Sequence, residues 1–217
     1  MNRRIKKYLD SNIINLENKK ILLIGKGYIG SAIYEELKYK GAKVYFSSSK
    51  DNADINLDFS KKINFDEINK LNLDYIIINS GIDLNDDINL LVNYLGPKAL
   101  IDELKNNIKF IVCVSISKRK DSYSTSKRKL LNYCNDLKKE GYDIRVYHPG
   151  ICYSKLFRKR NKLSFLYRFI LNNKYKAALC ALYCLNERQN VNCWASPKYN
   201  INGYPRIKKY EDWYTFK

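Results

Sequence analysis

Tyr123 and Lys127 are the residues whose types and spacing best suit acid–base chemistry. On a helix, side chains four positions apart lie on one face and within reach of each other. An ammonium group beside a phenol favours the phenolate and therefore lowers the phenol pKa. Such a phenol can exchange a proton with a substrate hydroxyl or carbonyl. Because the chain has 19 tyrosines, the spacing alone is weak evidence, and the surrounding elements decide its meaning.

Short apolar runs alternate with helical stretches along the chain. We expect strands at residues 20–24, 42–46, 53–57, 74–79, 109–115 and 143–147, with a short last strand near 199–202. We expect helices at residues 29–40, 59–71, 86–106 and 122–140, followed by one or two more. Continuous β-branched runs separated by helices indicate a parallel sheet covered on both faces, so the pattern predicts a doubly wound α/β fold. Ligands in such folds bind beyond the carboxyl ends of the strands.

A glycine-rich turn, Gly25-Lys-Gly27-Tyr-Ile-Gly30, follows the first expected strand. Gly25 permits a tight turn, Gly27 lets the backbone approach a pyrophosphate, and Gly30 allows close packing of helix on strand. Tyr28 and Ile29 begin the helix, whose N-terminal N–H groups suit an anion. The pattern predicts a dinucleotide site, and the alternative is an ordinary tight turn.

Hydroxyl groups and a cation follow the second expected strand, at Ser47, Ser48 and Lys50. A site selective for NAD usually places a carboxylate here to hold the ribose hydroxyls. Serine and lysine side chains suit a 2′-phosphate instead, so NADP is favoured over NAD. The alternative is a polar surface turn.

Polar residues and glycines also follow the later strands. Asp58 could accept a hydrogen bond from an adenine amino group, and Ser115 could polarise a substrate carbonyl. Residues that could line the cofactor trough follow the fourth strand, at Asn79, Ser80 and Gly81. After the sixth strand come a turn that lets backbone approach the nicotinamide and a hydroxyl that could bind its carboxamide or a phosphate, at Pro149, Gly150, Ile151 and Ser154.

Length and composition indicate one globular domain over residues 1–217, because 45% of the residues are hydrophobic. No apolar run approaches the roughly 18 residues that span a bilayer, and no apolar signal core follows the basic start, so we expect a cytoplasmic protein without an integral membrane segment. The six cysteines form no Cys-x-x-Cys pair and there is one histidine, so neither a metal site nor disulfides are expected. A net charge of +18 favours anionic partners, but no nucleic-acid motif accompanies it, and nucleic-acid binding is not expected.

These motifs, in this order, resemble the short-chain dehydrogenase/reductase family over about residues 20–155. The resemblance implies a three-layer Rossmann-type domain with a seven-stranded parallel sheet, and hydride transfer between a nicotinamide cofactor and a carbonyl or alcohol substrate. Tyr123 looks like the catalytic acid/base and Lys127 like its partner, and Asn93 is similar to the asparagine that anchors a proton-relay water. Two further motifs resemble the family's Asn-Ala-Gly and Pro-Gly signatures, namely Asn79-Ser-Gly81 and His148-Pro-Gly followed by Ser154.

The sequence departs from the family pattern in four ways. The glycine spacing is tighter than usual, and the gaps before Asn93 and before Tyr123 are short. Ile116 separates two serines that are normally adjacent. Ser115 is the first candidate for the hydroxyl that polarises the substrate, and Ser117 is the second.

A basic segment at residues 155–176 begins where the family carries its substrate-binding loop. We expect lid helices over residues 155–185 that would recognise an anionic substrate. A membrane-surface helix and an ordinary surface helix with a basic outer face are the alternatives. Residues 177–185 are expected to form a core helix or a subunit contact.

Two other functions are weighed against the oxidoreductase. One is a nucleotide-sugar epimerase or dehydratase with a tightly held nicotinamide, although such enzymes usually have a longer C-terminal substrate domain. The other is a dinucleotide-binding protein without turnover, which the shortened loops and the separated serines would favour. The sequence leaves the substrate open, and it leaves open whether the chain forms a homodimer or a homotetramer.

Overall fold

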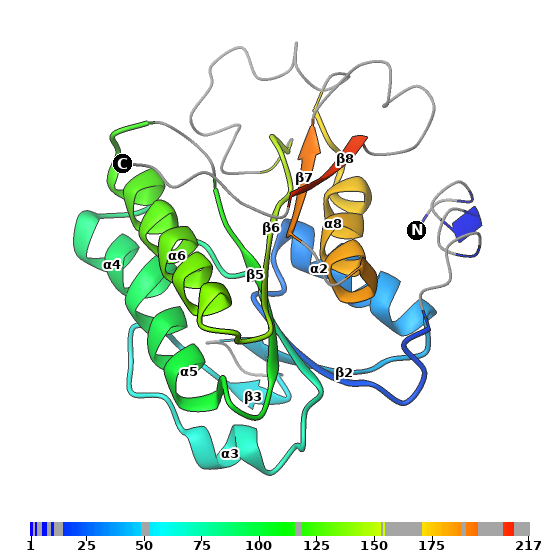
Figure 1. Ribbon diagram of the computed structural model, residues 1–217, viewed down its shortest axis with the longest axis horizontal. Helices are drawn as coiled ribbons and strands as arrows, with labels where there is room; N and C mark the ends of the chain where they lie inside the picture. Colours follow the sequence, from blue (N-terminus) through cyan, green and yellow to red (C-terminus); the bar gives the residue numbers. More distant parts are fainter. Residues whose placement is uncertain are drawn as a thin grey trace.

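Eight strands form one sheet in this computed structural model, which describes residues 1, 3, 6, 7, 10, 15–48, 53–115, 119–152, 154, 171–187, 190–194 and 206–210. The strand order is β3-β2-β1-β4-β5-β6-β7-β8 (Figure 1). The strands are β1 (Lys20–Ile24), β2 (Lys43–Ser48), β3 (Ile55–Asn56), β4 (Tyr75–Ile78), β5 (Lys109–Cys113), β6 (Ile144–His148), β7 (Asn190–Trp194) and β8 (Arg206–Tyr210).

Neighbouring strands run parallel from β3 through to β7, and β8 pairs antiparallel with β7. The predicted doubly wound α/β fold is therefore confirmed. In the described part of the chain seven strands run parallel, and β8 adds an eighth, antiparallel strand at the edge of the sheet. The strand order reverses between β1 and β4, and this reversal marks the switch point where ligands of such folds bind.

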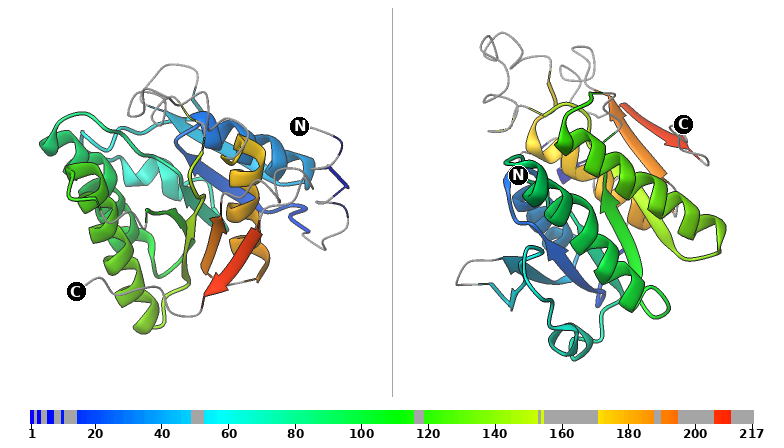
Figure 2. Two further views of the ribbon diagram at one scale, coloured as in Figure 1. Left: turned by 90° about the horizontal axis from the view of Figure 1, so that it is seen from above. Right: turned by 90° about the vertical axis from the view of Figure 1, so that its left-hand side faces the viewer.

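Helices cover both faces of the sheet, as the two further views show (Figure 2). On one face, α2 (Tyr28–Tyr39) packs beside α8 (Lys174–Glu187). The other face is covered by α3 (Phe65–Asn69), α4 (Asp86–Leu90), α5 (Gly96–Leu104) and α6 (Ser122–Lys139). A π-helical turn, Leu91–Leu95, joins α4 to α5.

Alternate residues of each central strand enter two separate cores. Leu22 and Ile24 of β1 face α3, α5 and α6, whereas Ile21 and Leu23 face α2 and α8. All four side chains are fully or almost fully buried, which explains why the strand is a continuous apolar run. In α8, most of the stretch 177–185 is buried as well, so this stretch is part of a core helix, as predicted.

A buried arginine holds the end of α8 against the sheet. The guanidinium of Arg145, on β6, donates to the backbone oxygens of Cys184 (2.7 Å) and Leu185 (3.1 Å). It also forms a two-point ion pair with Asp143, with both N···O distances at 2.7 Å. The carbonyl groups at the end of a helix lack intrahelical donors, so this side chain supplies a cap from another element.

Two stretches differ from the sequence-based expectation. Residues 59–71 were expected to be helical, but only Phe65–Asn69 is. The Asp58 carboxylate accepts hydrogen bonds from the N–H and the hydroxyl of Ser60, and such local bonds compete with helix formation. The strands β7 and β8 were not predicted, and the strand expected near residues 199–202 lies outside the described residues.

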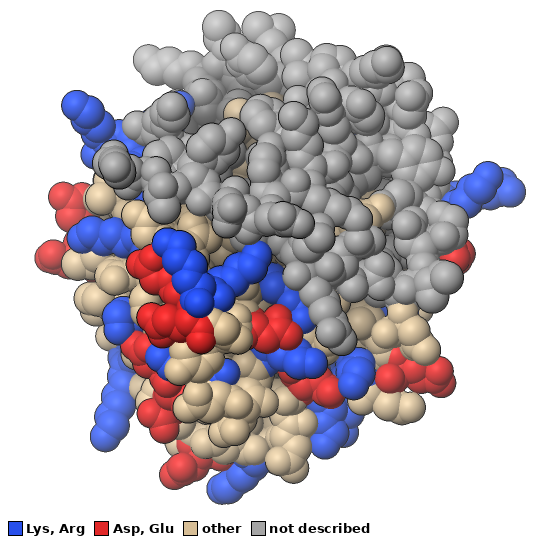
Figure 3. Space-filling view, in the orientation of Figure 1, with Lys and Arg blue, Asp and Glu red and all other residues tan. Residues whose placement is uncertain are grey.

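Basic and acidic side chains are interspersed over the described part of the face in Figure 3. Among the described residues, ion pairs join Lys98 to Asp102 and Lys139 to Asp136. Among the described helices, none combines the length and the apolar character that a membrane span requires.

Candidate functional site

The glycine turn lies at the switch point between β1 and β4. Gly25 has a φ of +91°, and a Cβ atom added there would lie 2.8 Å from the backbone nitrogen of Ser80. The turn therefore passes directly against the residues that follow β4. Only glycine satisfies both the positive φ and this close approach.

The other two glycines differ sharply in their surroundings. A Cβ atom added at Gly30 would lie 2.0 Å from the Gly25 carbonyl oxygen, so helix α2 packs against the turn through backbone alone. A Cβ atom added at Gly27 would meet nothing within 4 Å. Gly27 is also the N-cap of α2 and offers no side-chain cap, so the start of the helix faces open space. This arrangement suits an anion such as a pyrophosphate.

Asn79 ties the glycine turn to the sheet. Its amide nitrogen donates to the Gly25 carbonyl oxygen at 3.0 Å, and its amide oxygen accepts from the Tyr147 hydroxyl at 2.7 Å. The amide is thus engaged by protein groups on both sides. Sequence reasoning placed Asn79 in the cofactor trough but missed Tyr147, a fully buried residue of β6.

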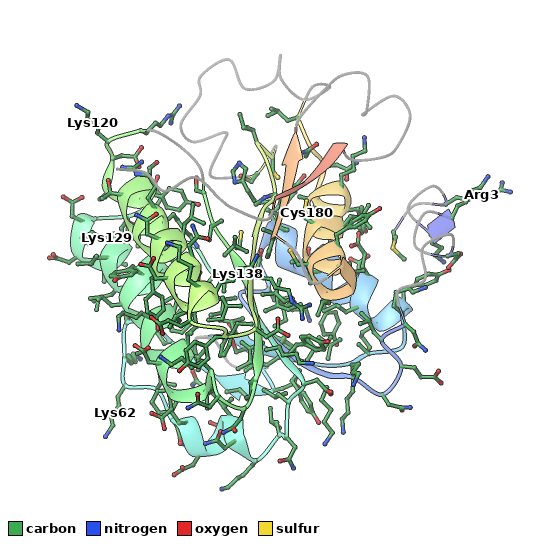
Figure 4. All side chains as sticks on the ribbon, viewed as in Figure 1. Arg3, Lys62, Lys120, Lys129, Lys138 and Cys180 are labelled. Carbon is green, nitrogen blue, oxygen red and sulfur yellow. The ribbon has the colours of Figure 1, made fainter. Side chains whose placement is uncertain are left out.

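Lys127 is buried at the place where β4 and β5 end. Its ammonium donates to the backbone oxygens of Ser80 (2.7 Å) and Cys113 (3.2 Å). Burial lowers its pKa from the usual value. An ammonium carries three N–H donors, so a third hydrogen bond is possible beyond these two. Figure 4 gives the contrast on the same helix, because it labels Lys129, which is exposed.

Gly81 lies between Lys127 and Asn93. A Cβ atom added at Gly81 would be 3.6 Å from the Lys127 ammonium nitrogen and 3.7 Å from the Asn93 amide oxygen. The fully buried Asn93 amide accepts from the Ile82 N–H (3.0 Å) and donates to the Ile82 carbonyl oxygen (2.8 Å). Asn93 therefore fixes the chain directly after Gly81. It does so from the π-helical turn, a feature that is frequent at functional sites.

Tyr123 lies one turn before Lys127 on α6 and is partly buried. The position i to i+4 puts both side chains on one face of the helix. The start of α6 is fixed by Asp121, whose side chain accepts from the Ser124 N–H at 2.7 Å as an N-cap. The Ser122 hydroxyl accepts a further hydrogen bond, at 2.8 Å, from the amide of Asn89 on α4.

The remaining candidates follow β2, β5 and β6. Ser115 is partly buried just beyond β5, whereas Ser117 and Lys50 lie outside the described residues. After β6, Gly150 has a φ of +72° and Ile151 is 55% exposed, so the predicted Pro149–Gly150 turn is present. Ser154 is described two residues after Cys152, but residues 155–170, the first part of the expected lid, are not.

A buried hydroxyl and a cation from the glycine turn lie near the end of β2. Ser47 is 1% exposed, and its hydroxyl has no hydrogen-bond partner among the described residues. The ammonium of Lys26, in the glycine turn, lies 3.9 Å from the ring centroid of Phe46 and 4.0 Å from that of Tyr34. Sequence reasoning missed Lys26, although a basic residue between two glycines of such a turn was a signal.

His148, the single histidine, gives a prediction for pH. Burial lowers its pKa to about 4, although its Nδ1 bonds the Val114 carbonyl oxygen at 3.2 Å. Below the ordinary pKa of 6.5, the unfolded chain binds a proton that the folded protein excludes until about pH 4. The free energy of unfolding should therefore fall by up to about 3 kcal/mol as the pH drops through this window.

The imidazole NMR signals of this single histidine provide the direct measurement. We expect a midpoint near pH 4 in the folded protein. The variant His148→Gln should lose the part of the pH dependence of unfolding that lies between about pH 4 and 6.5. A midpoint at or above the ordinary value would contradict the buried neutral state.

Comparison with known proteins establishes the fold. No family model matches the sequence, and no curated protein does. Solved structures do match, among them a 3-α-hydroxysteroid dehydrogenase from Pseudomonas sp. B-0831 complexed with NADH, with a TM-score of 0.67 and 16% identity over 85% of this chain and 99% of that chain. A short-chain dehydrogenase/reductase from Serratia marcescens matches with a TM-score of 0.67 and 16% identity over 84% and 98%. A short-chain dehydrogenase from Burkholderia cenocepacia in complex with NADP matches with a TM-score of 0.65 and 17% identity over 84% and 98%. The chain thus has the fold of the short-chain dehydrogenases/reductases.

Proposed function

We propose that the protein is an NADP(H)-preferring oxidoreductase that interconverts a carbonyl compound and an alcohol. The observation that carries the proposal is the position of Lys127. Its buried ammonium lies beside Gly81, at the switch point of a fold whose solved examples include complexes with NADH and NADP. It is also one helical turn from Tyr123.

The glycine turn fits a dinucleotide. The open space at Gly27 and the start of α2 would receive the pyrophosphate, because the first N–H groups of a helix lack intrahelical partners. Gly81 would let the ribose next to the nicotinamide approach the Lys127 ammonium, which has a third donor for its hydroxyls. When bound, the nicotinamide supplies or accepts the hydride.

Tyr123 is the group that we propose to move the proton. Its phenol would donate to the carbonyl oxygen in reduction and would accept the proton back in oxidation. The ammonium of Lys127 favours the phenolate, which brings the phenol closer to neutral pH. Ser115 would donate a hydrogen bond to the oxygen on which negative charge develops.

A preference for NADP over NAD is supported at the end of β2. Neither position 47 nor position 48 carries the carboxylate that usually holds the ribose hydroxyls of NAD. The Lys26 ammonium lies over the ring of Phe46 on that strand. A cation in this place is a donor that a phosphate binds strongly.

Titration with NADPH and with NADH, followed by fluorescence, tests the proposal. We expect NADPH to bind about tenfold more tightly, which corresponds to one additional charged hydrogen bond. The variant Lys26→Met should reduce the ratio of the NADH dissociation constant to the NADPH dissociation constant. The control Lys38→Met should leave the ratio unchanged, because Lys38 lies in the last turn of α2, at the end away from the glycine turn.

The possible results test the preference for NADP, the catalytic activity and the binding of a dinucleotide separately. Equal or tighter binding of NADH would overturn the preference for NADP. Tight NADPH binding without turnover on a broad panel of carbonyl compounds would favour a non-catalytic dinucleotide-binding protein. Absence of any dinucleotide binding would overturn the proposed function altogether.

A further inference from the structure

We infer that Tyr147 is a positioning residue for the glycine turn, acting through Asn79. The inference rests on the proposed function, because it assigns to Tyr147 the task of holding the turn in the shape that receives a dinucleotide. Tyr147 itself lies on β6, two strands away from Asn79 and three from the strand that leads into the turn.

The first step is the orientation of the Asn79 amide. The Gly25 carbonyl oxygen can only accept, so the amide nitrogen must face it, as the 3.0 Å contact shows. The amide oxygen then faces the Tyr147 hydroxyl at 2.7 Å, and that hydroxyl must donate. Burial raises the pKa of Tyr147 well above its usual value, so the phenol keeps the proton that it donates. With this donor in place, a flipped amide would leave two donors facing each other.

The second step is the effect on the turn. The Gly25 carbonyl is also confined by Gly30, because a Cβ atom added at Gly30 would come within 2.0 Å of the carbonyl oxygen. The same Cβ atom would lie 2.9 Å from the Asn79 amide nitrogen, so Gly30 leaves the space in which this amide reaches the carbonyl. Asn79 thus fixes the carbonyl and, with it, the peptide plane that leads towards Gly27. The N–H groups that would face the pyrophosphate depend on that plane.

The third step is the position of Tyr147 in the core. Its side chain is 0% exposed and packs in the core beneath α2 and α8, with the Cys113 thiol beside its hydroxyl. Because the ring is packed on all sides, the position of the hydroxyl that donates to Asn79 is fixed. A phenylalanine ring would fill this core position without requiring a hydrogen-bond partner, so packing alone does not account for the hydroxyl.

The variant Tyr147→Phe tests the inference, since it keeps the ring and removes only the hydroxyl. Hydrogen–deuterium exchange of the dinucleotide-free protein should accelerate about 5- to 10-fold at the Ser31 amide, which donates to the carbonyl oxygen of Gly27 in the turn at 2.9 Å, as expected for the loss of one hydrogen bond. The dissociation constant for NADPH should rise by a similar factor, while kcat at saturating NADPH stays unchanged. The matched control is Tyr75→Phe at the amino end of β4, which should alter neither quantity.

A double-mutant cycle tests whether Tyr147 acts through Asn79. If it does, Tyr147→Phe should add nothing to the effect of Asn79→Ala on turn exchange. Unchanged exchange and affinity in Tyr147→Phe would overturn the inference, and so would fully additive effects. If the wild-type protein binds no dinucleotide, the proposed function fails, but exchange at the Ser31 amide, which bonds the Gly27 carbonyl oxygen, still decides the role of Tyr147.

Discussion

Replacement of Tyr123 by phenylalanine is expected to lower kcat by about 10²- to 10⁴-fold, the usual contribution of a general acid or base. The variant keeps the ring on α6 and loses only the hydroxyl that we propose to carry the proton. Dinucleotide affinity should stay close to wild type, because Lys127 keeps its contacts with the carbonyl oxygens of Ser80 and Cys113. Steady-state rates with the best carbonyl substrate, together with NADPH titration, measure the two effects separately.

A second tyrosine provides the control for this variant. Tyr142 follows α6 and packs against the core from its far end, away from the switch point. Tyr142→Phe should keep both the rate and the affinity. Full activity in Tyr123→Phe would remove Tyr123 from the chemistry, whereas a parallel loss of affinity and thermal stability would indicate a structural role.

Substitution of two glycines in the turn should separate binding from folding. Gly27→Ala should leave the free energy of unfolding nearly unchanged, because the added methyl meets nothing within 4 Å and the φ of −78° suits alanine. The methyl would instead lie where the pyrophosphate approaches the backbone. We expect NADPH to bind about 100-fold more weakly, equivalent to the loss of one or two charged hydrogen bonds.

Gly30→Ala should act on the fold itself. Its methyl would lie 2.0 Å from the Gly25 carbonyl oxygen, and neither backbone segment can move without the other. Overpacking of this kind typically costs about 1–3 kcal/mol, so both thermal stability and NADPH affinity should fall. Wild-type affinity in Gly27→Ala would mean that no pyrophosphate lies against this residue. Wild-type stability in Gly30→Ala would mean that the turn can relax.

Local patterns in the sequence were enough to predict the fold and to propose most of the candidate site. The apolar runs and the glycine turn identified the strands from β1 to β6, because strands buried on both faces must be apolar throughout. The spacing of Tyr123 and Lys127 placed them on one helical face without any knowledge of the tertiary structure.

The contacts of the side chains were decided only by the tertiary structure. The sequence pattern does not indicate that Tyr147 reaches Asn79, because the two lie 68 positions apart and meet only when β6 and β4 join the same sheet. Similarly, the partners of Lys127 are backbone carbonyl groups at the ends of two other strands. Every residue has a backbone carbonyl group, so the sequence cannot indicate which of these groups will accept a hydrogen bond from Lys127.

Tyr123 and Lys127 illustrate which properties follow from the sequence and which follow only from the tertiary structure. The sequence by itself determined that a phenol and an ammonium share a helical face in a doubly wound fold. Only the tertiary structure decided that the ammonium is buried beside Gly81, with the turn at Gly25 packed against the adjacent Ser80. The physical reason is that spacing along a helix is fixed by the backbone, whereas burial and hydrogen-bond partners depend on which strands the sheet brings together.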